Sequence, residues 1–368
     1  MVERFDNLRI PVTSSKREKG ITPYYGANGI QDYVQGYTHD GEFVLVAEDG
    51  ANDLQNYPVH YVNGKVWVNN HAHVLQGKNK MVDNLFLVNA IKQIKIETYL
   101  VGGSRAKLNA DVMMKLPIKV PTFNEQQKIG EYFSKFDTLI ALHQRKLEHL
   151  QEQKKGLLQK MFPKNGEVVP EVRFPGFTDA WEQRKLGDFF KKYQNKIFLD
   201  DTTKYIQISV RNTGKVEYRT TNYGKDIGRK RQYLVDTKNY PDTLTFTRQT
   251  IYEGGIGYIP SSLNGAIVTE NMPLLAKNSK IDKNFSKILF KTHLYYHNVI
   301  EKNKPIGSAQ KALHEKVWLE SVVTVPTLLE QQKIGEFFKQ LDSLITLHHR
   351  KLEKLKQLKK FLLQNMFI

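Results

Sequence analysis

A few short groups of histidine and carboxylate side chains could support chemistry. His71 and His73 alternate along an expected strand, and this spacing could offer two imidazoles to one metal ion, although alternate histidines of this kind are more often polar surface. Glu48 with Asp49, and Asp200 with Asp201, are adjacent acidic pairs that have no lysine or histidine constellation around them. We therefore expect neither a catalytic site nor a metal centre from these residues.

Sequence motifs that carry catalysis are absent from the 368 residues. There is no phosphate-binding loop, no dinucleotide-binding glycine motif, no nucleophile elbow and no His-Glu-x-x-His. The Pro-Pro-aromatic tetrapeptide of amino-methylating DNA methyltransferases is also missing. The chain has no cysteine, which excludes disulfides, cysteine nucleophiles and cysteine-based zinc sites. The sequence predicts a binding protein that is not an enzyme by itself and holds no cofactor.

The formal net charge of +17 at pH 7 points to a polyanionic partner, and nucleic acid is the first to consider. No apolar run approaches the ~20 residues that span a bilayer. The first nine residues lack the apolar core of a secretory leader. We therefore expect a cytoplasmic protein with no membrane partner.

Arginines and lysines interleaved with tyrosine and asparagine suit phosphate clamping combined with contacts to base edges. The basic excess lies mainly in residues 164–324, with a formal charge of +9 against +2 for residues 1–119. The candidate DNA contacts are Lys16, Arg17, Lys19, Tyr25, Asn28, Asn70, Arg105 and Lys107 in the first region, and Arg211, Arg219, Lys225, Arg229, Lys230, Arg231, Arg248 and Lys311 in the second. Lys107 and Lys311 stand at matched places beside Gly-Ser turns. A solvated surface without a partner is the alternative interpretation for each residue.

An internal repeat organises the chain. Residues 120–162 and 325–367 are identical at 28 of 43 positions, at a constant offset of 205. Each copy has a seam position every 3.5 residues, the period of a left-handed coiled coil. The predicted helix-pair seam is Ile129, Phe133, Ile140, Leu147, Leu150 and Leu157 with Ile334, Phe338, Ile345, Leu352, Leu355 and Leu362. Each helix should have about 38 residues and be roughly 57 Å long.

Two polar residues interrupt the seam at the same places in both copies. His143 and His348 are one pair of equivalents, and Lys154 and Lys359 are the other. We expect them to fix the register of the helices or to pack where the helices cross, in preference to a ligand or catalytic role.

The chain is thus predicted to contain two globular domains, each followed by a long helix. The expected boundaries are a first domain over 1–119, a first spacer helix over 120–163, a linker over 164–180, a second domain over 181–324 and a second spacer helix over 325–368. The fold class is α+β, with two α/β domains and two long helices that pair as a coiled coil.

Local patterns predict several elements of the globular domains. Residues 42–46 indicate a buried strand, and residues 62–68 indicate a hairpin that turns at Asn63-Gly64. Helical spacing covers residues 84–100 and 285–300, and strands are expected around 205–218 and 244–259. Beyond this shared order the two domains look unlike each other.

Together these residues resemble the specificity subunit of type I restriction-modification enzymes. The resemblance is carried by the doubled Pro-Thr-x-x-Glu-Gln-Gln-Lys-Ile-Gly-Glu with a long helix that ends in Leu-Leu-Gln-x-Met-Phe. It is carried also by Val172-Arg-Phe-Pro-Gly-Phe, which is followed by Trp181-Glu-x-x-Lys-Leu-Gly at the start of the second half. It covers nearly the whole chain.

The resemblance implies two target-recognition domains, each of which reads one half of a split sequence in double-stranded DNA. It implies that the two helices pair as an antiparallel coiled coil with pseudo-two-fold symmetry and act as the spacer. It also implies that two methyltransferase subunits and the restriction subunits are the partners. Target adenines would be flipped out for methylation, and S-adenosylmethionine, ATP and Mg²⁺ would belong to those partners.

One departure from the family pattern concerns the start of the first domain. The stretch from Arg173 to Gly187 has no counterpart ahead of Phe5, so about 20 residues of the opening are expected to be missing there. A coiled-coil adaptor that binds no DNA is the alternative function. A stand-alone nuclease or methyltransferase is disfavoured by the missing motifs.

Overall fold

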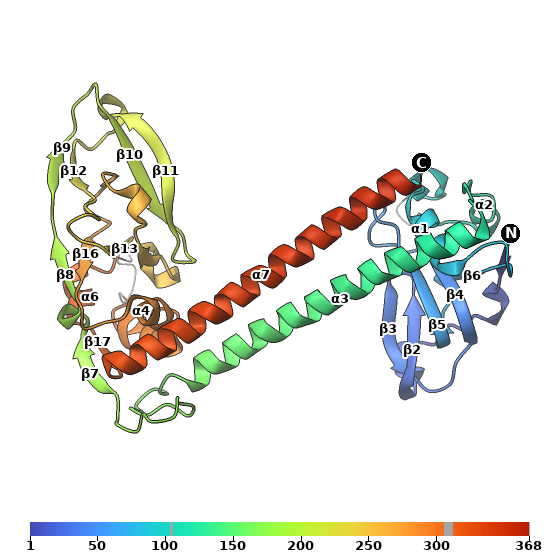
Figure 1. Cartoon of the computed structure of the whole chain (residues 1–368), viewed down its shortest axis with the longest axis horizontal. Helices are drawn as coiled ribbons and strands as arrows, with labels where there is room; N and C mark the ends of the chain where they lie inside the picture. Colours follow the sequence, from blue (N-terminus) through green and yellow to red (C-terminus); the bar gives the residue numbers. More distant parts are fainter. Residues whose placement is uncertain (104–105, 305–311, 368) are drawn as a thin grey trace. The chain divides into compact units, whose positions relative to one another are not determined.

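The computed structural model describes residues 1–103, 106–304 and 312–367 (Figure 1). The chain divides into two compact units. The first unit comprises Met1–Lys146 and His348–Ile368, and the second comprises Leu147–Leu347. Each long helix therefore contributes one part to each unit.

A six-stranded sheet forms the framework of the first unit. Its strand order is β1 (Val2–Arg4), β6 (Ala72–Gly77), β4 (His39–Ala47), β5 (Val59–Val68), β2 (Lys19–Gly26) and β3 (Gly29–Val34). All neighbours are antiparallel except β2 and β5. Helix α1 (Asn84–Lys92) packs on this sheet. The buried run from Phe43 to Ala47 confirms the predicted strand.

The hairpin predicted at Asn63-Gly64 is wrong. Strand β5 continues through both residues and pairs with β4 from Val59 to Val66. Gly64 has φ +90°, which a turn would use to reverse the chain, but here it lies opposite Gly41, whose φ is +140°. The long ladder with β4 and the burial of Val59, Val62 and Val66 outweigh the local turn preference. The conformation of residues 62–68 is therefore set by pairing with β4, and a local sequence pattern carries no information about that partner strand.

The helix predicted over residues 84–100 is shorter than expected. Helix α1 ends at Lys92, and a 3₁₀ helix follows at Ile96–Tyr99. The first unit also contains 3₁₀ helices at Asp6–Leu8 and Ser14–Lys16, and the short helix α2 at Ala110–Met113.

The second unit contains three sheets. The five-stranded sheet has the order β11 (Val216–Tyr223), β10 (Lys204–Val210), β15 (Ile267–Val268), β12 (Arg231–Leu234) and β9 (Lys196–Phe198). The four-stranded sheet has the order β14 (Ile256–Tyr258), β13 (Leu244–Phe246), β16 (Leu274–Lys277) and β8 (Phe190–Tyr193). The smallest sheet pairs β17 (Val322–Val325) with β7 (Glu182–Lys185). Strands expected around 205–218 and 244–259 are confirmed.

Short helices complete the second unit. They are α4 (Lys283–Leu289), α5 (His293–Tyr295), a π-helical turn at Tyr296–Glu301 and α6 (Glu315–Glu320). The helix predicted over residues 285–300 is therefore broken near Phe290. Trp318 of α6 is fully buried against Phe190, Phe246 and Phe290.

The two long helices are α3 (Phe123–Lys160) and α7 (Leu328–Met366), with 38 and 39 residues. All of the predicted seam residues are buried or half-buried. Within the first unit, Ile129 and Phe133 of α3 share a core cluster with Leu362 of α7. Within the second unit, Leu150 shares a cluster with Leu341 and Ile345. In both units, residues early in one helix meet residues late in the other, so the contacts run antiparallel.

The polar seam residues pair with one another. His143 Nδ1 lies 3.0 Å from His348 Nδ1. Lys154 donates to Asp342 at 2.5 Å, and the equivalent Lys359 donates to Asp137. Burial lowers the pKa of His348, and the positive charges of His143, Lys351 and Lys146 lower it further. These contacts support the register role expected for the polar positions.

The Glu-Gln-Gln motif fastens each long helix to its globular part. The side-chain oxygen of Gln126 accepts a hydrogen bond from Asp83 N at 3.0 Å, and its amide donates to Met81 O and Pro121 O. Asp83 in turn caps α1 by accepting from Phe86 N at 2.8 Å. Gln331, Asp282 and Phe285 repeat this arrangement in the second unit. The repeated motif therefore makes the same contacts between helix and globular part in both units.

Gly130→Ala should destabilise the first unit. A Cβ at Gly130 would lie 2.7 Å from Asp83 Oδ1, 2.8 Å from Leu85 Cβ and 2.9 Å from Phe86 N, so α1 would have to move. Overpacking of this kind costs about 1–3 kcal/mol. At Gly156, also inside α3, an added Cβ meets no atom within 4 Å, so Gly156→Ala should be neutral or stabilise by up to about 1 kcal/mol. Denaturant unfolding of both variants checks this, and equal effects would contradict the proposed close contact.

Candidate nucleic-acid interface

Several exposed cations of the second unit lie on or near strand β11, which is an edge strand of the five-stranded sheet. Tyr218 and Tyr223 of β11 are 55% and 41% exposed, and Arg219 between them is exposed. The ammonium groups of Lys204 and Lys225 lie 5.0 and 5.8 Å from the centre of the Tyr223 ring. An edge with cations beside aromatic faces suits phosphate and base contacts.

A second group of predicted contacts comes just before and at β12, and it is exposed but paired with acids. Arg229 donates to Glu270 at 2.7 Å, and Lys230 donates to Asp201. Arg211, which follows β10, likewise donates to Glu217 of β11 at 2.5 Å. Exposed ion pairs of this type contribute only about 0–1 kcal/mol. A phosphate could therefore replace these acids at little cost, and Arg231 is exposed beside them.

Arg248 lies apart from this exposed group. Its side chain is 14% exposed, and its guanidinium donates to Glu315 at 2.6 Å. Glu315 also accepts from Lys192. Burial alone raises the pKa of Glu315, but the hydrogen bonds from Lys192 and Arg248 outweigh it and lower the pKa to about 2. We interpret Arg248 as a structural residue that is not part of the DNA interface.

The predicted DNA contacts in the first unit also include both exposed side chains and side chains that are held by other residues. Lys16 and Lys19 are exposed, while the Arg17 guanidinium lies 4.1 Å from the centre of the Tyr24 ring and 3.4 Å from Asp32. Asn28 is exposed, but its amide donates to Gly50 O at 2.9 Å and its oxygen accepts from Asn52 N.

The remaining candidates of the first unit have different surroundings. Tyr25 is half-buried beside the His60 ring, and Asn70 is exposed. Lys107 donates to Glu48 at 2.7 Å and is 44% exposed. Arg105 and Lys311 lie outside the described residues.

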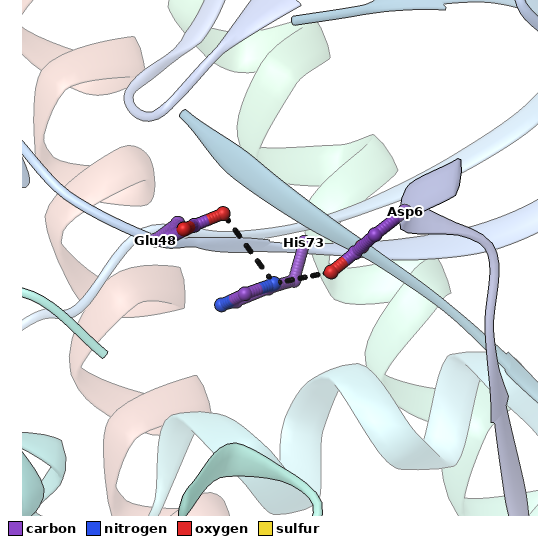
Figure 2. Close-up of side chains that lie close together, drawn as sticks. All are labelled: Asp6, Glu48 and His73. Atoms are coloured by element: carbon purple, nitrogen blue, oxygen red, sulfur yellow. Dashed lines mark hydrogen bonds and ion pairs between the residues drawn. The ribbon is translucent and has the colours of Figure 1, made fainter. Parts of the chain in front are cut away.

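The two histidines considered as a metal pair are not brought together. His71 Nδ1 bonds Asp49 at 2.5 Å. His73 is 1% exposed, and its Nδ1 bonds Asp6 Oδ2 at 2.7 Å and lies 3.6 Å from Glu48 Oε2 (Figure 2). No local sequence signal points to Asp6 as a partner of His73, because 67 residues separate the two.

Asp6, Glu48 and His73 offer ligand atoms within 4.8 Å of one another, the spacing of a metal site. The surrounding bonds argue against a metal. His73 Nε2 donates to Leu108 O at 2.8 Å, and its Nδ1 lies 2.7 Å from Asp6 Oδ2. Arg9 and Lys107 donate to Glu48 at 2.6 and 2.7 Å and neutralise its charge. This cluster is an ion-pair network that joins β4, β6 and the loop of Lys107.

Comparison with known proteins identifies the family. The family model of the type I restriction modification DNA specificity domain matches residues 2–152 and 178–357. The chain is 47% identical over 137 residues to a type I restriction enzyme specificity subunit of Haemophilus influenzae, a match that covers 37% of this chain and 34% of that protein. It is 26% identical over 304 residues to the MjaVIII specificity subunit of Methanocaldococcus jannaschii, covering 78% and 70% of the two chains.

A solved structure shows the same fold. The S subunit of a type I restriction-modification system from M. genitalium matches 100% of this chain and 96% of its own, with a TM-score of 0.63 at 14% identity.

The chain has the fold of a specificity subunit and belongs to the type I restriction modification DNA specificity family. The predicted family and the α+β fold class are therefore confirmed, and the comparisons give no support to the adaptor alternative. The match to the first of these relatives spans about a third of that protein's length. Among the described residues, no helix has both the length and the apolar character that a bilayer span requires.

Asp6→Asn should weaken the first unit at neutral pH. Burial raises the pKa of Asp6, but hydrogen bonds from His73 and Val74 N, with the charges of His73 and Arg9, outweigh it and hold the pKa below its ordinary value. Burial also raises the pKa of Glu48, but hydrogen bonds from Lys107 and Arg9 outweigh it and lower the pKa below its ordinary value. A lowered carboxyl pKa stabilises the fold above the ordinary pKa, and this contribution is lost as pH falls through the folded value. We expect a loss of about 2 kcal/mol at pH 7 that shrinks towards pH 3.

Denaturant unfolding at both pH values measures this difference. The matched control is Asp40→Asn, an exposed carboxylate on the same sheet, which should change stability by less than about 0.5 kcal/mol. Zn²⁺ should not raise the melting temperature of the native chain. A zinc-dependent increase that Asp6→Asn abolishes would show that the cluster is a metal site after all.

Proposed function

We propose that this chain is the non-catalytic DNA-recognition subunit of a type I restriction-modification complex. It reads a bipartite target in double-stranded DNA and positions methyltransferase and restriction subunits on it. The observation that carries this proposal is the family match in two stretches, each of which contains one globular part and most of the long helix that follows it. In this proposal residues 1–119 and 181–324 are the target-recognition domains, residues 120–163 and 325–368 are the spacer helices, and residues 164–180 are the linker.

The paired helices support a bipartite target. His143 and His348 are equivalent positions and they contact each other, and the ion pairs Lys154–Asp342 and Lys359–Asp137 are equivalent too. Exchanging the two copies therefore leaves the pattern of helix contacts unchanged. Duplex DNA has the same kind of local two-fold symmetry, so a duplicated reader suits two half-sites separated by unread bases.

Exposed leucines on the long helices support docking of partner subunits. Leu139 and Leu142 of α3 are 43% and 60% exposed, and their equivalents Leu344 and Leu347 of α7 are both 46% exposed. Apolar residues repeated on an outer helix face are typical of protein interfaces. We propose that one methyltransferase subunit binds at each equivalent pair. S-adenosylmethionine, Mg²⁺ and ATP then belong to the partners, and the target adenine is flipped out to reach the methyltransferase.

Mapping of N6-methyladenine across a genome tests the proposed function. Cells that make this chain with its methyltransferase partner should carry a split motif, with two short specified halves around a fixed gap, and cells lacking only this chain should not. The absence of any motif that depends on the chain would contradict DNA recognition.

The exposed cations near β11 and β12 should supply phosphate contacts. A variant with Arg219→Ala, Lys225→Ala and Arg231→Ala should bind target DNA more weakly in the methyltransferase complex. The slope of log K against log salt should fall by about 0.9 for each phosphate that the variant no longer neutralises. Lys339→Ala, which removes one charge from an exposed position on α7, is the control and should leave the slope unchanged. An unchanged slope in the triple variant would exclude this surface as the interface.

The paired helices should set the unread gap. Four residues inserted after Gln151, matched by four after Ile345 on the facing part of α7, should lengthen the pair by one turn, about 6 Å. This corresponds to roughly two base pairs at 3.4 Å per step. Methylome mapping should then show the same half-sites with a wider gap. An unchanged gap in an active complex would show that the helices are not the ruler.

A further inference from the structure

Two large apolar residues are more exposed than any other in the described part of the chain. Ile21 of β2 is 93% exposed and Phe198 of β9 is 75% exposed, whereas the others reach 60% at most. One of the two belongs to each unit. Partly exposed leucines are normal on a protein surface, but an isoleucine and a phenylalanine with so little cover call for an explanation.

A bulge in β2 puts Ile21 in its position. Lys19 and Thr22 both pair with Val34 of β3, so the two residues between them are left out of the ladder. Gly20 passes so close to β3 that an added Cβ would lie 2.3 Å from Val34 O. The path of the backbone therefore holds Ile21 outside the regular pairing of the sheet.

The chain just ahead of this bulge is tied down. Arg17 Nε donates to Val12 O at 3.1 Å, and its guanidinium lies 4.1 Å from the centre of the Tyr24 ring. Tyr24 belongs to β2 and is buried, so Arg17 links the segment before the bulge to the strand after it. A side chain on a preorganised backbone loses little freedom when a partner covers it.

Strand alternation puts Phe198 in its position. Ile197 and Leu199 share a core cluster with Ile227 and Ile267, and neighbouring residues of a strand point to opposite faces of the sheet. Phe198 therefore points away from that cluster. A shift of β9 by one residue would turn Phe198 inward but would expose Ile197 and Leu199, so the register of this edge strand fixes the exposure of Phe198.

Both residues stand beside exposed cations that pair with no acid among the described residues. These cations are Lys16 and Lys19, shortly before Ile21, and Lys196 and Arg231, of which Arg231 lies directly opposite Phe198 in the sheet. Their charges call for an anionic partner, and the apolar side chains call for an apolar one. Duplex DNA offers both, because its stacked bases lie between two rows of phosphates.

We propose that Ile21 and Phe198 are DNA wedges, each of which enters the base stack of one half-site while the neighbouring cations bind the flanking phosphates. This inference rests on the proposed function, in which each domain reads one half-site. An inserted apolar side chain unstacks a base step and kinks the duplex. An adenine beside such a step costs less to turn out of the helix, so the wedges help the methyltransferase subunits to reach their targets.

A protein partner fits these surroundings less well than DNA does. An apolar pocket on another subunit would cover Ile21 or Phe198, but it would also bring the unpaired cations into the centre of a protein interface. Charged residues, lysine above all, are depleted at such centres. Lysine and arginine are the usual neighbours of apolar side chains that proteins insert into DNA.

Fluorescence of 2-aminopurine in the complex with the methyltransferase subunits tests this proposal. The probe is a duplex that carries the motif found by methylome mapping, with 2-aminopurine in place of the target adenine of one half-site at a time. Its fluorescence rises when the base leaves the stack, and the native chain should give a rise at both half-sites. Ile21→Ala should reduce this rise at one half-site and slow methylation there by about 10-fold, the scale of a lost stacking contact. Phe198→Ala should do the same at the other half-site.

Matched variants separate a wedge from other roles of these side chains. Ile21→Leu and Phe198→Leu keep an apolar wedge and should retain most of the methylation rate. A mismatch at the target base pair lowers the cost of turning the adenine out, so it should restore the fluorescence rise with both alanine variants. Met81→Ala and Val317→Ala remove exposed apolar side chains outside β2 and β9, one in each unit, and should have no effect.

Alanine variants that flip and methylate like the native chain would overturn the proposal and leave the proposed function intact. A loss at the same half-site with both variants would also overturn it. Sedimentation velocity covers the remaining occupant: if Ile21→Ala or Phe198→Ala weakens assembly with the methyltransferase subunits, that side chain is a subunit contact and not a wedge. A native complex that recognises no split motif would overturn the proposed function, and the wedges with it.

Discussion

The pairing of a helix with its own duplicate is the constraint on which the rest of the structure depends. At the centre of an antiparallel pair of equivalent helices each residue meets its own equivalent, and away from the centre residue types must be complementary across the pair. His143 and His348 meet at the centre, where two imidazoles can share one hydrogen bond. Lys154 and Lys359 lie away from it, and each meets an aspartate of the other helix, Asp342 or Asp137. The polar interruptions of the seam therefore occur at the same positions in both copies because one register must satisfy both.

The same duplication lets the two globular parts differ. Each is joined to its helix by one glutamine, one helix-capping aspartate and one glycine that allows close approach, as at Gln126, Asp83 and Gly130. Beyond this joint the cores diverge. Trp318 fills the centre of the second unit, and its equivalent in the first unit is Met113, beside an apolar cavity of about 280 Å³. A change of sheet order or loop length inside one unit leaves the joint intact. In the proposed function, this allows one scaffold to carry two different DNA-reading surfaces.

The long helices were predictable from the sequence because their period and their caps are local, and because a repeat at a constant offset needs no tertiary information. The hairpin at Asn63-Gly64 was not predictable, since its outcome depends on the ladder with β4. The candidate site was only partly predictable. In the sequence Arg248 resembles its basic neighbours, but in the structure it is largely buried and paired with Glu315, 67 residues away. His73 likewise joined Asp6 across 67 residues. Pairing with a distant acid decides whether a cation is free to bind phosphate, and composition carries no signal for it.

The two units offer different surfaces to a polyanion. The second carries its cations on an exposed sheet edge beside Tyr218 and Tyr223, while the first exposes apolar and aromatic side chains such as Ile21, Tyr33 and Tyr37 around its edge strand. Phosphate contacts make affinity depend on salt, whereas stacking and apolar contacts depend on it much less. In the proposed function, salt-sensitive binding then belongs mainly to the second domain, and the first contributes shape and base contacts. The formal charges of +9 for residues 164–324 and +2 for residues 1–119 agree with this division, so the net charge of the whole chain comes mainly from residues 164–324.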